Sequence, residues 1–308
     1  MADDAKPPAP SVAVAPAATP TPTAPQQPGK AIAGPRVVGA RSRESIWTLR
    51  RALPRSLQLP FMFALPVLIF AVWCALTLGA HPVVDKLFLP SPGAVLAALI
   101  RSLLVDRSLL PNIGASLYRI IVSFAIAAAV AVPLGVMMGA FEPVNRLFEP
   151  IMAPLRYLPI SAFIPLLILW LGIEEKQKIA FLFLGVFVYL LPVVVTAIRA
   201  VPEELVQTAL TLGASKLQVI WTVLLPAALP DIFDSFRVMN AISWTYVILA
   251  EIVNARSGLG YMIQLAGNHL HTDEIFAGIL VIGVIGLLTD AAIRTANDLL
   301  FGWREGGL

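Results

Sequence analysis

The stretch KIAFLFLGVFVYLLPVVVTAI, from Lys178 to Ile198, decides the fold class of the protein. After its first residue it contains no charged side chain, and nearly all of its other residues are apolar. A helix needs about 20 such residues to cross a bilayer, because the hydrocarbon core is about 30 Å thick and a helix rises about 1.5 Å per residue. The stretch therefore predicts a transmembrane helix.

The composition indicates that the chain crosses the membrane several times. Hydrophobic residues make up 58% of the 308 residues, charged residues make up 13%, and the mean hydropathy is +0.81. A soluble globular protein has about 25% charged residues. We therefore predict an all-α polytopic membrane protein with about six transmembrane helices. The other five apolar segments are 61–79, 116–139, 159–173, 236–253 and 275–293, of which 159–173 is short and is expected to begin near Ile151.

Several other classes of protein fit the sequence poorly. A net charge of +3 is too small for a nucleic-acid-binding protein. Cys74 is the only cysteine, so neither a disulfide framework nor a zinc site is expected. His269 and His271 lie in one short polar run, which a solvated external loop explains better than a metal site. We predict no metal site and no nucleic-acid partner.

The two ends of the chain indicate its domain boundaries and its orientation. Residues 1–55 are rich in proline and alanine and have few large apolar groups, which predicts a disordered tail. The transmembrane domain is then expected over 56–303, with a short C-terminal end at 304–308. If six spans alternate, fifteen Lys and Arg residues fall on the side of the tail and seven on the other. The positive-inside rule then places both termini in the cytoplasm.

The segment SPGAVLAALIRSLL, from Ser91 to Leu104, predicts a short amphipathic helix between the first two spans. Ser91 is a suitable N-cap residue, and Pro92 suits the first helical turn. We expect this helix to lie on the membrane surface. The apolar residues expected to share one face are Val95, Leu96, Leu99 and Leu103.

A polar stretch between the fourth and fifth spans predicts two short helices. Pro202 and two following glutamates favour a helix start, and Gly213 favours its end. Ser215 and Gln218 have the spacing of a capping box, and Pro226 is expected to end the second helix. Two short helices joined at a glycine can fit a groove of a partner, and an interfacial loop without a partner is the alternative.

The spacing in this stretch resembles the cytoplasmic loop of the permease subunits of bacterial ABC importers. Ala209 is followed after three residues by Gly213, after nine more by Val223, and after one more by Leu225 and Pro226. Gln207 and Thr208 replace the usual Glu and Ala of the family pattern. Four further segments are similar to the permeases for nitrate, bicarbonate, taurine and alkanesulfonates: LPSPGAV (89–95), SLYRIIVSF (116–124), IPLLILWLGI (164–173) and AEIVNARSGLGY (250–261).

The resemblance implies a set of partners and a place in the bacterial inner membrane. Two ATP-binding subunits, a second and identical permease subunit and an extracytoplasmic solute-binding protein would join this chain in the lipid bilayer. The sequence contains no phosphate-binding G-x-x-x-x-G-K-[ST] pattern, so we expect no enzyme activity here, with ATP and Mg bound by the partner ATPase. The resemblance assigns ATPase coupling to Gln207, Thr208, Ala209, Leu212, Gly213 and Ala214.

Charged and aromatic residues within the spans are candidates for the substrate pathway or a gate. A charge inside a span costs at least about 2.5 kcal/mol on insertion scales, so Arg119, Glu251 and Asp290 need partners or shielding. Arg119 and Glu251 are expected at similar depth, which predicts an ion pair that holds an outer gate. The alternative is that Arg119 contacts an anionic substrate. Trp244 is expected to line the pathway and Trp170 to belong to the interfacial aromatic belt.

The predicted function is alternating-access import of a small anion of the sulfonate, taurine, nitrate or bicarbonate class. One alternative is an importer of the same type for a neutral vitamin precursor. Another is an ion-coupled secondary transporter, for which ionisable residues near the midplane and paired interrupted helices would be expected. An intramembrane hydrolase fits poorly because the histidines are all expected outside the spans, and no catalytic residue is predicted.

Overall fold

The computed structural model of the protein describes residues 55–78, 83–253 and 255–302. The chain divides into two units, Met1–Pro60 and Phe61–Leu308, and the helical bundle belongs to the second. Within the described ranges all regular structure is helical, which confirms the all-α prediction. The predicted tail up to residue 54 and the C-terminal end, 304–308, lie outside the described residues, so the domain boundaries remain predictions.

Five helices are long and apolar enough to cross a membrane. Each exceeds the roughly 20 residues that a span requires, and together they account for five of the six predicted segments. They are α1 (Arg55–Thr77), α3 (Leu109–Ala140), α6 (Glu175–Arg199), α9 (Leu225–Ile252) and α11 (Thr272–Phe301).

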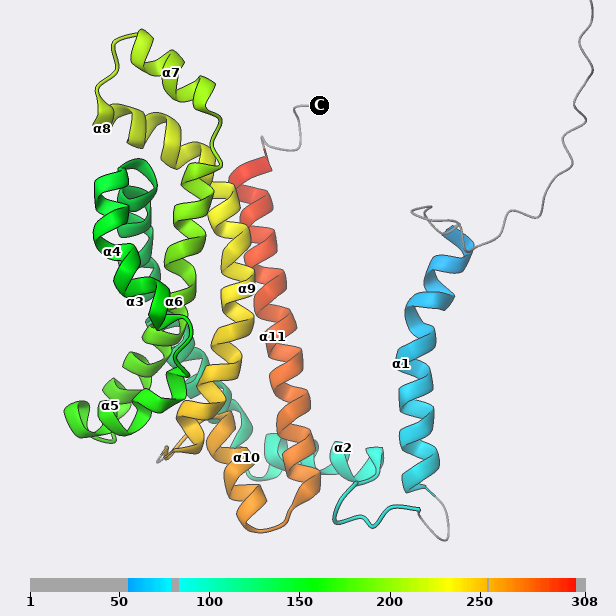
Figure 1. Ribbon diagram of the computed structural model, residues 1–308. Helices are drawn as coiled ribbons and strands as arrows, with labels where there is room; N and C mark the ends of the chain where they lie inside the picture. Colours follow the sequence, from blue (N-terminus) through cyan, green and yellow to red (C-terminus); the bar gives the residue numbers. More distant parts are fainter. Residues whose placement is uncertain (1–54, 79–82, 254, 303–308) are drawn as a thin grey trace, which may run out of the picture. The chain divides into compact units, whose positions relative to one another are not determined.

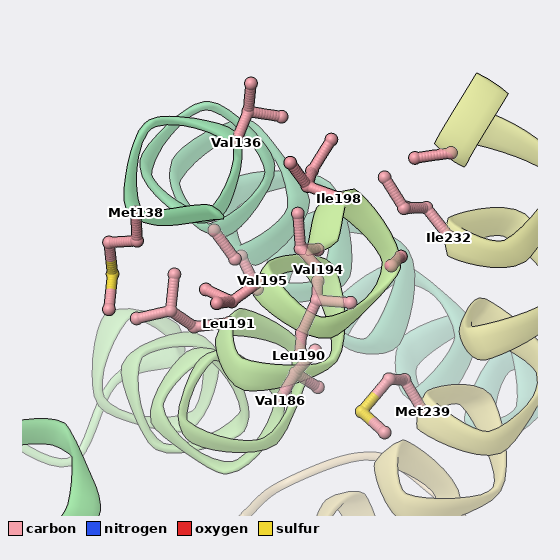
Figure 2. Close-up of a cluster of buried hydrophobic side chains, with 14 of the residues drawn as sticks. Val136, Met138, Val186, Leu190, Leu191, Val194, Val195, Ile198, Ile232 and Met239 are labelled. Atoms are coloured by element: carbon pink, nitrogen blue, oxygen red, sulfur yellow. The ribbon is translucent and has the colours of Figure 1, made fainter. Parts of the chain in front are cut away.

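The helix that contains the opening stretch, α6, lies at the centre of the bundle. It packs between α3 and α9, and α11 contacts the other side of α9 (Figure 1). Phe181, Leu182 and Val194 of α6 are fully buried. Figure 2 shows the side chains of α6 between those of Val136 on α3 and Met239 on α9. The high apolarity of the stretch therefore reflects burial among neighbouring helices as well as a place in the membrane.

The close contact of α3 and α6 depends on Gly135. A β-carbon at this position would come within 2.7 Å of the Val194 side chain, closer than two carbon atoms can approach. Small residues at such contacts allow two membrane helices to pack backbone against backbone.

The third predicted span is not one straight helix, which corrects the prediction for 159–173. Helix α4 (Glu142–Leu155) is followed by a short 3-10 turn (Ile160–Phe163) and α5 (Ile164–Leu171), and the two parts meet at 91°. Pro159 disfavours helical backbone at Leu158, which lies in the bend. The eight residues of α5 rise about 12 Å, too short to cross a bilayer alone. With the bent pair as one span, the chain has up to six.

The amphipathic segment after residue 90 forms α2 (Pro92–Ile100), which continues in a π-helical turn to Val105. The Ser91 hydroxyl accepts a hydrogen bond from the Ala94 amide at 3.3 Å, as predicted for an N-cap. The residues of the predicted apolar face are divided between the interior of the protein and its surface. Val95 and Ala98 are buried, whereas Leu96 and Leu103 are exposed.

Candidate functional site

One end of the bundle carries the two short helices predicted from the polar stretch. Helix α7 (Glu203–Thr211) and helix α8 (Lys216–Val219) meet at Gly213, and α7 has no buried residue. We call residues 203–219 the projection. It lies at the same end of the bundle as the last turn of α11 (Figure 1).

A local hydrogen-bond pattern around Gly213 ends α7. The Ala214 amide donates to the Ala209 carbonyl at 3.0 Å, and the Gly213 amide donates to the Leu210 carbonyl at 3.0 Å. These two bonds form a Schellman motif, in which the residue after the C-cap takes a left-handed conformation. Gly213 has a φ of +86°, which glycine adopts without the steric cost of a side chain. The predicted turn is confirmed.

The predicted capping box at Ser215 is also present. The Ser215 amide donates to Gln218 Oε1 at 2.8 Å, and the Gln218 amide donates to Ser215 Oγ at 3.4 Å. These bonds satisfy two amides at the start of α8 that have no partner within the helix.

Pro226 does not end the second helix, which corrects the prediction. The chain continues from Lys216 to Ile252 as one long element, with a π-helical turn at Ile220–Leu224. In that turn the Leu225 amide donates to the Ile220 carbonyl, five residues back. Pro226 has no amide hydrogen, and it lies where the bonding pattern changes, so the helix passes it without stopping.

The projection exposes large apolar side chains beside its polar ones. Leu212 is 83% exposed, and Leu217 is also exposed, as is Trp221 just after the projection. Gln207 and Thr208 lie on α7, where the Gln207 amide group donates to Glu203 Oε1 at 2.7 Å and the Thr208 hydroxyl donates to the Glu204 carbonyl. Together these residues form a mixed surface outside the core of the chain, which suits contact with another protein.

The opposite end of the bundle contains an ion network in which Arg119 and Glu251 are buried and Glu175 is half-buried. Arg119 of α3 is 1% exposed, and its Nη1 donates to Glu251 Oε1 of α9 at 2.7 Å. Its Nε and Nη2 donate to the two carboxylate oxygens of Glu175 of α6, at 2.7 and 2.6 Å. The predicted ion pair of Arg119 and Glu251 is confirmed. Its role as a gate remains a prediction.

A glycine-containing turn completes this network. The Gly260 amide donates to Glu251 Oε2 at 2.8 Å, and Ser116 Oγ donates to the same carboxylate and accepts from the Leu259 amide. Gly258 has a φ of +116°, and a β-carbon there would overlap the Glu251 carboxylate. The turn therefore packs directly over Glu251 and begins α10 (Leu259–Asn268).

Two members of the ion network were not predicted from sequence. Glu175 lies at the start of a span beside other charged residues, where a solvated position was the simpler interpretation. Ser116 could have been found, because it precedes Arg119 by three residues and so shares one face of α3.

The remaining span residues have partners within the bundle. Trp244 is 5% exposed, and its Nε1 donates to Thr289 Oγ1 at 3.2 Å. Its role in the pathway remains a prediction. Asp290 pairs with Arg237 through bonds of 2.9 and 3.0 Å. Trp170 is exposed, and its place in the interfacial aromatic belt remains a prediction. Within the described ranges, no three His, Cys, Asp or Glu side chains are placed to hold a metal ion.

The fold and these two ends define a class, that of polytopic helical membrane proteins with an exposed two-helix projection. The chain belongs to the family of binding-protein-dependent transport system inner membrane components, whose model matches residues 131–300. The match includes the projection and Glu251. It does not include Arg119.

Two relatives and one solved structure illustrate the similarity. The taurine transport system permease protein TauC of Escherichia coli (strain K12) is 33% identical over 261 residues, which cover 83% of this chain and 92% of the relative. The putative aliphatic sulfonates transport permease protein SsuC of Bacillus subtilis (strain 168) is 33% identical over 241 residues, 78% of this chain and 86% of the relative. A chain of the MetNI methionine ABC transporter in an inward-facing conformation shares the fold, with a TM-score of 0.55, 21% identity and coverage of 62% and 94%.

Membership in this family makes the protein a multi-pass permease component of an ATP-driven, binding-protein-dependent importer in the inner membrane. The family implies an ATP-binding subunit and a substrate-binding protein as partners. It also decides against the ion-coupled secondary transporter.

Proposed function

We propose that this permease imports a small anion that carries a sulfonate group, by alternating access powered by ATP-binding subunits at the projection. The observation that carries the coupling role is the geometry of the projection. Its first helix is held at a fixed angle by the Gly213 turn and the Ser215 capping box, and it exposes Leu212. A short rigid helix with an exposed mixed surface suits a cleft in a partner protein.

Gln207, Thr208, Ala209, Leu212, Gly213 and Ala214 form the coupling helix and its turn in this proposal. ATP and Mg bind to the partner subunits, where hydrolysis takes place, and two such subunits serve two identical permeases. Closure of the ATP-binding subunits moves α7, and the continuous helix from Lys216 to Ile252 transmits this movement along the bundle. The projection and both termini then lie in the cytoplasm, as the distribution of Lys and Arg favours.

The ion network has a second role in this proposal. Arg119, Glu175 and Glu251 join α3, α6 and α9 at the end opposite the projection. Breaking a buried pair leaves an uncompensated charge, so these three helices move together there rather than separately. The network therefore holds the outer gate, on the side from which the binding protein delivers substrate.

The sulfonate class is supported by the relatives named for taurine and for aliphatic sulfonates. Uptake by the complex in proteoliposomes tests it, with the ATP-binding subunit inside and the substrate-binding protein outside. We expect ATP-dependent uptake of taurine or of an alkanesulfonate. Nitrate and bicarbonate are tested beside them as the related inorganic anions. Uptake of only a neutral vitamin precursor would contradict the anion class and leave the permease assignment in place.

A further inference from the structure

A cavity of about 690 Å³ lies between α6, α9 and the C-terminal end of α4. Its volume falls in the usual range for small-molecule sites, about 300 to 1,000 Å³. Most of its wall is apolar, from residues such as Pro192, Val238 and Met239. The polar residues of the wall are Arg156, Tyr189, Thr196, Asp231 and Ser235.

Arg156 lies where this cavity meets a second one. A smaller cavity, of about 200 Å³, lies between α3, α4 and α6, and Arg156, Pro192 and Thr196 line both. Arg156 is the C-cap residue of α4, at the start of the 91° bend. The bend that interrupts the third predicted span therefore places a guanidinium group at the junction of the two cavities.

The cavity extends well into the bundle. Pro192 lies about two helical turns before the end of α6, and Met239 lies near the middle of α9. The Arg156 side chain is exposed in this chain, so its guanidinium group is accessible to a molecule that enters the cavity. A charged residue that lines a water-filled cavity of a membrane protein often marks a pathway for a charged substrate.

Arg156 differs from Arg119 and Arg237 in its surroundings. Arg119 and Arg237 each pair with a carboxylate. Among the described residues no carboxylate forms an ion pair with Arg156, although Asp231 lines the same cavity. A guanidinium group in this situation offers paired donors that match two oxygens of a sulfonate or a similar oxyanion.

Three hydroxyl groups belong to the wall, and that of Tyr189 shares a hydrogen bond with Tyr246. The other two donate to backbone carbonyls. Thr196 Oγ1 donates to the Pro192 carbonyl at 2.9 Å, and Ser235 Oγ donates to the Asp231 carbonyl at 2.8 Å. Their remaining lone pairs can only accept hydrogen bonds, which an anion cannot supply. Arg156 is therefore the cationic donor through which this cavity can hold an anion.

We propose that Arg156 contacts the transported anion as it passes through this cavity, and that the site recognises the sulfonate group by charge and paired hydrogen bonds. A single cationic contact binds weakly, and a transport pathway needs weak binding so that the substrate can leave. This inference rests on the proposed function, because the anion class is taken from there.

Uptake of labelled taurine by the reconstituted complex tests the inference with two matched variants. Arg156→Gln removes the cavity cation, whereas Arg146→Gln removes a cation of the same helix that pairs with Glu142 at 2.7 Å and lines neither cavity. A hydrogen bond to a charged group is worth about 1.5 to 3 kcal/mol, so we expect Arg156→Gln to lower the uptake rate roughly ten- to hundredfold. Arg146→Gln should keep the wild-type rate, and equal rates for the two variants would overturn the inference.

A second measurement uses the wild-type complex and so avoids any failure of a variant to fold. Phenylglyoxal modifies accessible arginines, and mass spectrometry gives the extent of modification at Arg156 and at Arg146. Taurine in large excess should slow modification of Arg156 and leave that of Arg146 unchanged. Equal modification of Arg156 with and without taurine would overturn the inference. By contrast, a wild-type complex that hydrolyses ATP but imports no anion would overturn the proposed function itself.

Discussion

Arg119 is the central residue of the ion network at the end of the bundle opposite the projection. Its three nitrogen atoms donate to Glu175 and Glu251, and Nη1 also donates to the Ser257 carbonyl at 2.8 Å. Removing such a group from water is expensive, and only a complete set of partners compensates for that cost. The position therefore requires the planar, five-donor guanidinium group, which lysine does not offer.

Replacing Arg119 by glutamine should destabilise the bundle by about 3 to 5 kcal/mol, because Glu251 would remain buried without its cation. Thermal unfolding of the purified complex in detergent measures this change. Arg146→Gln is the control, since its partner Glu142 is exposed to solvent and its ion pair contributes little. Equal unfolding temperatures for the two variants would show that the ion network does not stabilise the bundle. Normal uptake by Arg119→Gln would exclude Arg119 as a substrate contact.

Sequence alone identified the ion pair but not its surroundings. Arg119 and Glu251 were predicted to pair because each is a charge within an apolar span, at a similar expected depth. Glu175 and Ser257 lie beside polar neighbours at the ends of helices, so nothing in their local sequence separates them from solvated residues. Arg156 was missed as a cavity residue for a related reason, because the bend that places it between α6 and α9 depends on packing between distant segments.

Among the helices, the two of the projection were predicted well because the residues that start and end them are close together in the sequence. A proline and two acids begin α7, a glycine ends it, and a capping box begins α8, all within a few residues. The bend between α4 and α5 and the passage of α9 beyond Pro226 were predicted wrongly. Pro226 was weighed without its context, since a π-helical turn accommodates it, and the third span was predicted from its apolar residues alone, without the sharp bend that follows α4.

The capping box should contribute measurably to the local stability of α8. Ser215→Ala removes the acceptor of the Gln218 amide, and the loss of such a cap typically costs about 1 kcal/mol. We expect hydrogen exchange of the amides in Lys216–Val219 to become about fivefold faster. Thr222→Ala is the matched control, because the Thr222 hydroxyl donates to a carbonyl of its own helix and caps nothing. Identical exchange in both variants would argue against a structural role for the box.

At the scale of the whole molecule, the bundle has two different ends and a cavity between them. The projection exposes its surface at one end, and the ion network fastens α3, α6 and α9 at the other. The helix from Lys216 to Ile252 contains a part of the projection and a part of the ion network, because it begins with α8 and its last two residues are Glu251 and Ile252. In the proposed mechanism, a movement of the projection passes along this one continuous element to the network.

The ratio of taurine imported to ATP hydrolysed, measured for Gly213→Val in proteoliposomes, tests the coupling role most directly. A β-carbon at Gly213 would meet no neighbouring atom within 4 Å, so the variant changes only the backbone preference that holds α7 at its angle. Gly93→Val is the control, because its β-carbon also enters open space while its backbone is helical. We predict that Gly213→Val inserts and hydrolyses ATP but imports little taurine for each ATP, whereas Gly93→Val keeps the wild-type ratio. A wild-type ratio for Gly213→Val would contradict the assignment of the projection as the coupling element.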